Sequence, residues 1–398
     1  MNIKSSVLGL AALGVVACSG CGDDGGDGGE GVEVVEVPAI AADAKATYAQ
    51  IVLASYEDSL TAAQALDQSL EAFTAAPSEQ TLTAARQAWL DSREPYLQTE
   101  VYRFYDGPID NPDDGPEGLL NAWPLDENYI DYTATEPTAG IVNGAEDITA
   151  AGLESLNEKD GEKNIATGYH AIEFLLWGQD MSDSGPGDRP FTDYVEDGSG
   201  TADNQGRRKL YLNTASELML THLQQLVDAW AEGQTNYRAE FEAADDKEAM
   251  RRVLTGMIVL SGFETGGERL QTALDSGEQE DEHSCFSDNT HRDMIQDIQG
   301  IQNVWRGSYT RLDGSTVSGA GIRDVIEAVD TDLAGQVDAK VDECLALANA
   351  LQTPFDQEIK PGADGNARVQ SLVVALNELD ALLQTVFQTF GLEIPEVE

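Results

Sequence analysis

The sequence predicts an all-α protein of two packed helical bundles, joined and interrupted by long irregular loops. Apolar residues recur about every 3.6 residues over most of the chain after Ile40, which is the pattern of amphipathic helices. Series that alternate apolar and polar residues between hairpin turns, which would indicate strands, are nearly absent. About eight helices exceed one four-helix bundle, and a weak likeness between residues 85–96 and 301–311 is compatible with a duplicated bundle.

The N-terminal residues do not share this helical pattern. Residues 1–17 carry one lysine and a short apolar run, which is typical of a secretory signal peptide and too short to cross a bilayer. Residues 15–18 resemble the lipobox of bacterial lipoproteins, which implies cleavage before Cys18 and lipid attachment to Cys18; ordinary signal cleavage is the alternative. The acidic, glycine-rich residues 18–38 are expected to form a tether between a bilayer and the folded part. Ser19 resembles the outer-membrane default of lipoprotein sorting.

Helical periodicity then divides the chain into segments. Ser78 is a good N-cap residue, and Pro95 is expected to kink or split the helix that follows it. The first bundle is expected over residues 39–235 and the second over residues 246–398. We expect helices at 46–73, 78–104, 148–157, 163–177, 205–230, 247–274, 291–305, 322–351 and 366–390.

Three long loops interrupt these helices. Residues 106–132 are rich in Asp, Pro and Gly and cannot form a regular helix. Residues 179–204 and 275–290 are the other two loops. Loops of this length within a folded domain are more often functional than idle.

Composition excludes some classes of partner. The formal net charge is -49, from 72 acidic and 23 basic side chains, so the surface should repel nucleic acid. Such a surface could concentrate metal cations, or it could serve solubility alone. Two cysteines of the folded part, Cys285 and Cys344, could form a disulfide in an exported protein or stay free, since the sequence does not show their separation.

The segment from Gly168 to Asp180 contains the main candidate site. His170 and Glu173 lie three residues apart in an otherwise apolar helix, so they can point at the same spot. Burying a carboxylate without a partner costs on the order of several kcal/mol. Imidazole and carboxylate are ligands of zinc and iron, so a metal ion could compensate Glu173. The alternative is a hydrogen bond between the two residues, or an ion pair between Glu173 and an arginine.

Additional ligands could come from two other segments. His283 and Asp288 lie in the acidic loop before His291, although Asp288 could equally cap the following helix. Glu264 lies four residues before Glu268 on one helix face and could supply a carboxylate or have a structural role. The fourth histidine, His222, is alone on an amphipathic helix and is expected to pack or to face solvent.

Residues 168–173 match the GxHxxE motif of the imelysin family, and this resemblance extends over most of residues 45–390. The segments 88–110, 121–132 and 279–291 also resemble the iron-regulated subgroup of that family. The resemblance implies a cell-envelope protein of two helical bundles with a site at their junction that includes the GxHxxE pair. The family was first classed as metallopeptidases and is also linked to iron uptake.

The leading hypothesis is therefore a lipid-anchored envelope protein that binds a metal ion, iron or zinc, through His170 and Glu173. Iron follows from the family resemblance, which also implies envelope iron-uptake components as partners. The first alternative is a metallopeptidase in which Glu173 or a carboxylate before His283 activates water; HExxH is missing from the chain. The second alternative is a structural surface module without a metal.

Overall fold

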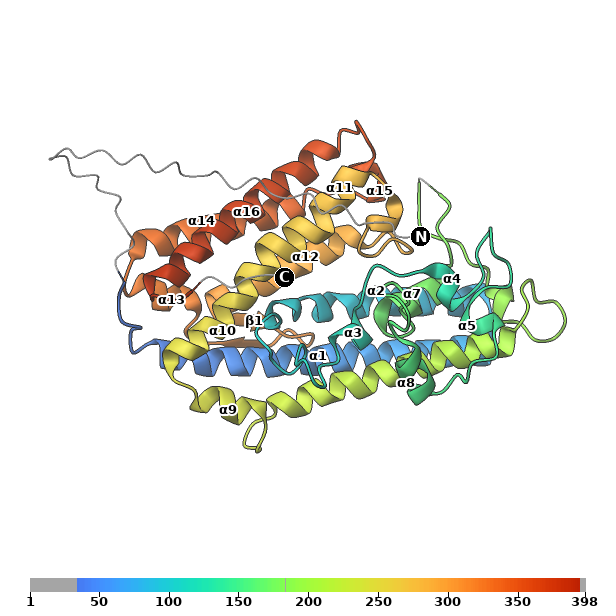
Figure 1. Ribbon diagram of the computed structural model, residues 1–398, viewed down its shortest axis with the longest axis horizontal. Coiled ribbons are helices and arrows are strands. Elements are labelled where there is room, and N and C mark those ends of the chain that lie inside the picture. The colour runs from blue at the N-terminus through green and yellow to red at the C-terminus, as the bar shows by residue number, and fades with distance from the viewer. Residues whose placement is uncertain (1–33, 183, 394–398) are drawn as a thin grey trace, which may run out of the picture. The chain divides into compact units, whose positions relative to one another are not determined.

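The computed structural model describes residues 34–182 and 184–393, and helices account for most of them (Figure 1). The described residues belong to one compact unit. The predicted signal peptide, the predicted lipidation site at Cys18 and most of the predicted tether lie outside the described residues. The described end of the tether has no regular structure, and Val35 donates a backbone hydrogen bond to Thr389 at 2.8 Å.

The first half of the described chain has three long helices separated by short ones. Ser78 caps the second long helix as expected, because its side chain accepts a hydrogen bond from the backbone of Thr81. The elements are α1 (Ala41–Ala75), α2 (Glu79–Leu97), η1 (Glu100–Tyr102), α3 (Glu117–Leu120), α4 (Glu127–Ile130), α5 (Gly140–Asn143), α6 (Ala150–Leu156), α7 (Gly168–Trp177), η2 (Phe191–Tyr194) and α8 (Gln205–Trp230).

The second half is also helical and includes one small hairpin. Its elements are α9 (Tyr237–Ala243), α10 (Asp246–Ile258), η3 (Val259–Gln271), α11 (Thr272–Ser276), η4 (Gln279–Asp281), α12 (Thr290–Arg306), β1 (Ser308–Thr310), β2 (Thr316–Ser318), α13 (Ile322–Glu327), α14 (Thr331–Ala348), α15 (Asp356–Ile359) and α16 (Asn366–Thr389). The segment η3 is a π-helix, and it joins α10 and α11 without a break.

Long helices pack side by side in two sets. In the first set α1 packs against α2 and α8, and the short α7 packs against α2 and α8 (Figure 1). In the second set α16 packs against η3, α10 and α14. Helix α12 contacts both α2 and α14. The division into two bundles with a boundary at residues 235–246 stays a prediction.

Several local expectations need correction. Tyr309 pairs with Val317 in an antiparallel hairpin, although no strand was predicted. The helix predicted at 322–351 is divided, because Asp330 caps a new helix through a hydrogen bond from Leu333. Pro95 does not split α2, which continues to Leu97. A proline so close to the C-terminus of a helix removes only one of the last hydrogen bonds.

The two cysteines of the folded part are both buried and both free, so they form no disulfide. Cys285 lies in the loop before α12, whereas Cys344 lies within α14, which packs against α12, α13 and α16. The two thiols therefore lie in different elements of the structure. Burial raises the pKa of each thiol.

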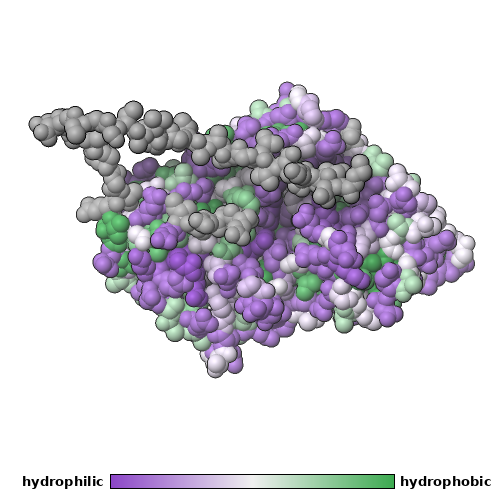
Figure 2. All heavy atoms as spheres, in the orientation of Figure 1, coloured by the Kyte–Doolittle hydropathy of each residue, from purple (hydrophilic) through white to green (hydrophobic). Residues whose placement is uncertain are grey.

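Hydrophilic residues cover most of the face shown in Figure 2, which is compatible with the charged composition. Within the described part of the chain, no helix is both long enough and apolar enough to cross a membrane.

Candidate metal centre

Helix α7 carries the GxHxxE motif, and all ten of its residues are buried. Gly168, its first residue, has a φ of 81°, a backbone conformation that residues with a side chain rarely adopt. A Cβ atom at this position would also collide with the carbonyl oxygen of Leu120 at the end of α3. Glycine therefore lets the buried helix begin against α3, which explains the first residue of the motif in physical terms.

Glu173 is fully buried in α7, and hydrogen bonds satisfy both of its oxygens. Oε2 lies 2.8 Å from Nδ1 of His170, one turn earlier. Oε1 accepts hydrogen bonds from the backbone N–H of Ser287 at 2.9 Å and from its hydroxyl at 2.6 Å. Burial raises the pKa of Glu173 to about 8, against the Ser287 hydrogen bond and the charge of Arg93. Among the described residues no arginine or lysine forms an ion pair with it.

His170 keeps one ring nitrogen without a partner. Nδ1 is engaged by Glu173, whereas Nε2 is buried and has no hydrogen-bond partner within the described residues. Burial lowers the pKa of His170 well below 6.5, and the charge of Arg93 lowers it further. The imidazole is therefore neutral at physiological pH. A buried polar atom without a partner is costly, and a bound ligand, water or ion often explains it.

His283 forms a second imidazole–carboxylate pair beside the first. Its Nδ1 lies 2.7 Å from Oδ2 of Asp293, which also accepts a hydrogen bond from the Ser284 hydroxyl at 2.5 Å. Burial lowers the pKa of His283 to about 3, so this ring is also neutral. The rings of His170 and His283 lie with their centroids 4.9 Å apart and their planes at 70°. The fold thus brings together two histidines that the sequence places far apart.

Arg93 supplies a fixed positive charge behind the two pairs. It is fully buried in α2, donates to Oδ1 of Asn121 at 2.6 Å, and lies 3.4 Å from Oδ2 of Asp293. Its guanidinium group stacks over the ring of Tyr169 at 4.9 Å. Arg93 keeps Asp293 ionised, because its charge lowers the pKa of that carboxyl although burial opposes the effect.

An acidic pocket of about 270 Å³ leads to His283. Four carboxylates line it against two guanidinium groups, so its lining carries a net negative charge. His283 and Trp123 lie in the same lining, with ring centroids 5.8 Å apart. Cations are therefore attracted towards the ring of His283. The charged residues of the lining are Arg103, Glu117, Glu158, Glu264, Glu268 and Arg269.

Glu264 takes part in an ion-pair network at the floor of this pocket. Arg269 is buried and donates to Glu264 at 2.9 Å, to Glu100 at 2.5 Å and to Asp297 at 2.9 Å. Both Glu264 and Arg269 belong to the π-helix η3. π-Helical turns are rare in proteins, and those that do occur often lie at functional sites. Glu264 thus has an arginine partner and also faces the pocket that contains His283.

Asp288 lies in a different cluster. One of its carboxylate oxygens lies within 4.8 Å of carboxylate oxygens of Asp180 and Asp356, in a group without histidine. Burial raises the pKa of Asp288 to about 7, and the charges of Asp356 and Asp180 raise it further. Asp288 thus belongs to a group of carboxylates that includes neither of the two imidazole rings, and its role as a ligand beside His283 stays a prediction.

The remaining histidines are outside this centre. His222 is buried on α8, with its Nε2 3.4 Å from Glu154, as the amphipathic pattern predicted. His291 lies in the first turn of α12. Sequence reasoning assigned no role to Arg93 and did not consider Ser287 or Asp293. The segment that contains Arg93 was noted, but nothing in the local pattern of Ser287 or Asp293 indicates their partners.

The fold and this centre define an all-α protein with a buried imidazole site at the end of an acidic pocket. The chain belongs to the imelysin family, because the family described as Imelysin matches residues 52–383. A relative named iron-regulated protein A, from Synechococcus elongatus, is 25% identical over 319 residues, which cover 78% of this chain and 75% of the relative.

Two solved structures share the fold. The crystal structure of an iron-regulated protein A precursor from Parabacteroides distasonis is 21% identical, with a TM-score of 0.69 over 91% of this chain and 97% of that chain. An imelysin-like protein from Psychrobacter arcticum is 13% identical, with a TM-score of 0.63 over 91% of this chain and 100% of that chain. At these identities the likeness concerns the fold alone.

Proposed function

We propose that this protein is an exported, lipid-anchored envelope protein that binds iron at His170 and His283 and acts in iron acquisition. It would be a binding component that performs no covalent chemistry. The observation that carries the proposal is the buried Nε2 of His170, which has no partner among the described residues and lies beside a second neutral imidazole.

The two carboxylates explain how neutral rings would serve as ligands. Histidines that bind metals almost always use one ring nitrogen for the metal and the other for a carboxylate or carbonyl partner. Here Glu173 and Asp293 engage the Nδ1 atoms, which leaves Nε2 of His170 as the ligand atom. Glu173 would then orient His170 instead of binding the ion directly. Glu264 is a candidate for a carboxylate ligand, because it lines the pocket with His283.

The choice of iron and of location depends on the relatives. Imidazole and carboxylate suit iron and zinc equally. The Synechococcus relative bears the name iron-regulated protein A, and a solved relative is a precursor of a protein of that name. Export and attachment at Cys18 are supported by the lipobox-like residues 15–18. Envelope iron-uptake components would be the protein partners.

The metallopeptidase alternative receives less support from the geometry. A general base has to reach a metal-bound water with a free carboxylate oxygen. Both oxygens of Glu173 are engaged, one by His170 and the other by Ser287, and the side chain is fully buried. The arrangement therefore favours capture of an ion over hydrolysis.

Metal titration of purified protein tests the proposal. The protein is stripped with chelator, titrated anaerobically with Fe²⁺ and separately with Zn²⁺, dialysed, and assayed for metal by mass spectrometry. The wild type should retain one equivalent of iron, whereas His170→Gln and His283→Gln should each lose affinity by about ten-fold or more. His222→Gln is the matched control, because it removes a buried histidine outside the site.

Two outcomes would overturn the proposal. If the wild type retains no metal, or if all three variants retain as much as the wild type, the imidazole pair is not a metal site. If zinc is retained through His170 and iron is not, the site stands but iron is the wrong cargo. Circular dichroism of each variant shows whether a loss reflects the site or the fold.

A further inference from the structure

We propose that Asp180, Asp288 and Asp356 form a second cation site, separate from the imidazole centre, that takes a hard divalent ion of the Ca²⁺ class. The three residues come from segments that are far apart in the chain: the end of α7, the loop before α12 and the first turn of α15. Each offers one carboxylate oxygen, and these oxygens all lie within 4.8 Å of one another. The site does not depend on the proposed iron function.

Burial is the first argument for an ion at this place. Asp288 is 6% exposed and Asp356 is 7% exposed, while Asp180 is half-buried. Like charges gathered out of water repel one another and lose hydration, and such groups are retained where they are paired or coordinate a metal. A bound cation would remove both penalties.

The second, independent argument is the state of the Asp288 side chain. Neither of its carboxylate oxygens has a hydrogen-bond partner among the described residues, although the side chain is almost completely buried. One of these oxygens faces the carboxylates of Asp180 and Asp356. In the described part of the chain, no arginine or lysine forms an ion pair with Asp288.

The donor set selects the class of ion. All three ligands are carboxylates, and hard oxygen donors suit calcium, magnesium and manganese better than soft metals. Calcium takes six to eight oxygens at about 2.3–2.6 Å, so two oxygens on one ion lie at most about 5 Å apart. The spacing of the three carboxylates satisfies this limit. Magnesium, at about 2.1 Å, would require oxygens no more than about 4.2 Å apart.

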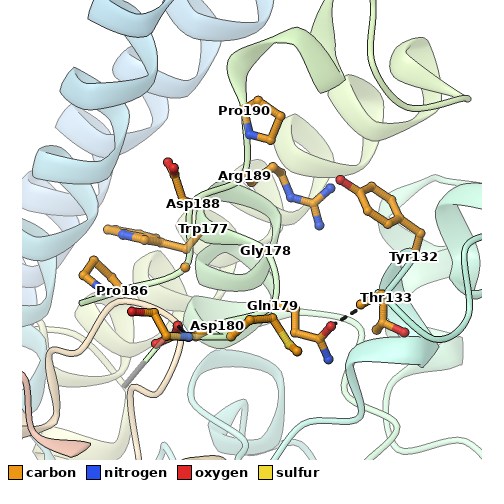
Figure 3. A pocket seen from close by; sticks show the side chains of 14 residues that line it. Tyr132, Thr133, Trp177, Gly178, Gln179, Asp180, Pro186, Asp188, Arg189 and Pro190 are labelled. Atoms are coloured by element: carbon orange, nitrogen blue, oxygen red, sulfur yellow. Dashed lines mark hydrogen bonds between the residues drawn. The ribbon is translucent and has the colours of Figure 1, made fainter. Parts of the chain in front are cut away.

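Open pockets border the cluster and would give an ion and its water ligands access. Asp288 lines a pocket of about 350 Å³, together with Ser287 and Asn289. Asp180 lines a pocket of about 390 Å³, where it lies well away from Arg189 (Figure 3). The guanidinium group of Arg189 instead pairs with Asp131 at 2.8 Å.

The position of the cluster suggests what the ion would do. Asp288 directly follows Ser287, which holds Glu173, and Asp180 lies just after the end of α7. An ion bound to both would therefore fix the loop before α12 to the helix that carries His170. This second ion would be structural, since it holds in place the residues that orient the imidazole.

Calcium titration of the stripped, full-length protein tests the site, with calorimetry for affinity and thermal unfolding for stability. The wild type should bind one Ca²⁺ and unfold at a higher temperature when calcium is present. Asp288→Asn should lose at least ten-fold in calcium affinity and the thermal shift, yet fold without calcium, because it removes an unpaired buried charge. Glu280→Gln is the matched control, since it removes one exposed acid from the same loop.

The variants separate this site from the iron site. His170→Gln should bind calcium like the wild type, so a failure of iron binding leaves this test intact. Equal calcium affinity in Asp288→Asn, Glu280→Gln and the wild type would overturn the proposal. Binding of Zn²⁺ that depends on Asp288, without any binding of Ca²⁺, would also overturn the assignment to a hard ion.

Discussion

At the residue scale, the central question is how a carboxyl group stays buried inside an apolar helix. Glu173 does so through hydrogen bonds with Ser287 and His170 together with a raised pKa, so it is mostly protonated at neutral pH. Among the described residues, Glu173 forms no ion pair with an arginine, which was one alternative expected from the sequence. Arrival of a cation at Nε2 of His170 would favour the carboxylate form, so metal loading is coupled to proton release.

Replacing Glu173 by glutamine should therefore change how stability depends on pH. The pKa of Glu173 is about 8 in the folded protein against an ordinary value near 4.5. Its contribution to stability is thus fully present below pH 4.5 and is lost as the pH rises through 8. Glu173→Gln mimics the protonated form, so it should match the wild type most closely below pH 4.5. Between pH 6 and pH 9 the stability of the variant relative to the wild type should increase by on the order of 2 kcal/mol.

Urea denaturation of metal-free protein at both pH values checks this expectation. Other acids with raised pKa values affect both proteins equally, so the difference between the two proteins is the informative quantity. A variant that is less stable than the wild type by the same amount at pH 6 and pH 9 would show that Glu173 is ionised throughout.

How far the centre could be predicted is also decided at this scale. His170 and Glu173 could be identified because their spacing on one helix is a local property. The roles of Ser287, Asp293 and Arg93 could not, because each depends on a contact between distant segments. Asp288 was noted as a candidate ligand, but its carboxylate partners lie in two other segments of the chain.

At the scale of elements, the long helices follow the apolar periodicity, whereas their interruptions depend on tertiary contacts. The segment predicted as one helix at 247–274 is helical throughout, but its middle is the π-helix η3. Apolar periodicity does not distinguish an α-helix from a π-helix, since both are continuous helices with one apolar face. The glycines in η3 were a partial signal: a Cβ on Gly262 would lie 2.8 Å from Asp380 on α16.

The start of α7 provides a sharp test at this scale. Gly168→Ala should destabilise the protein by at least about 1–2 kcal/mol, the cost of a left-handed conformation for a residue with a side chain. The collision with Leu120 adds to that cost. Chemical denaturation measures the change, and metal titration should show weaker iron binding because His170 shifts with the helix.

Gly335→Ala is the control for that variant. Gly335 lies in the interior of α14, is exposed and has open space around it. Alanine there should be neutral or should stabilise the protein by up to about 1 kcal/mol. If both alanine variants behave alike, the special conformation of Gly168 has no energetic importance.

At the scale of the whole molecule, the large negative charge bears on the attraction of cations, and the N-terminal segment bears on the proposed envelope location. The formal net charge of -49 raises the local concentration of divalent ions near every acidic pocket. Family and fold class could be predicted from the sequence, because the motif and the helical pattern extend over most of the chain. The arrangement of the helices could not, because helix packing depends on contacts that no local pattern records.

Attachment to the membrane should depend on one cysteine. Cys18→Ser should remove the lipid and release the exported protein into the soluble fraction, because the lipid at Cys18 is its proposed attachment to the bilayer. Labelling with a fatty-acid analogue and fractionation of cells measure both effects. Cys21→Ser, three residues later, should remain labelled and membrane-bound. Soluble wild-type protein, or equal labelling of the two variants, would contradict lipid attachment at Cys18.

The depth of His170 would set the time scale of ion exchange at the proposed metal site. Its side chain is only 1% exposed, and the pocket that opens to solvent is lined by His283. An ion that dissociates from Nε2 of His170 would have to pass the ring of His283, or the segment around Ser287 would have to move. The residence time of the ion would then be governed by the rate of that opening. Transfer of the ion to a partner protein would require the partner to displace the segment.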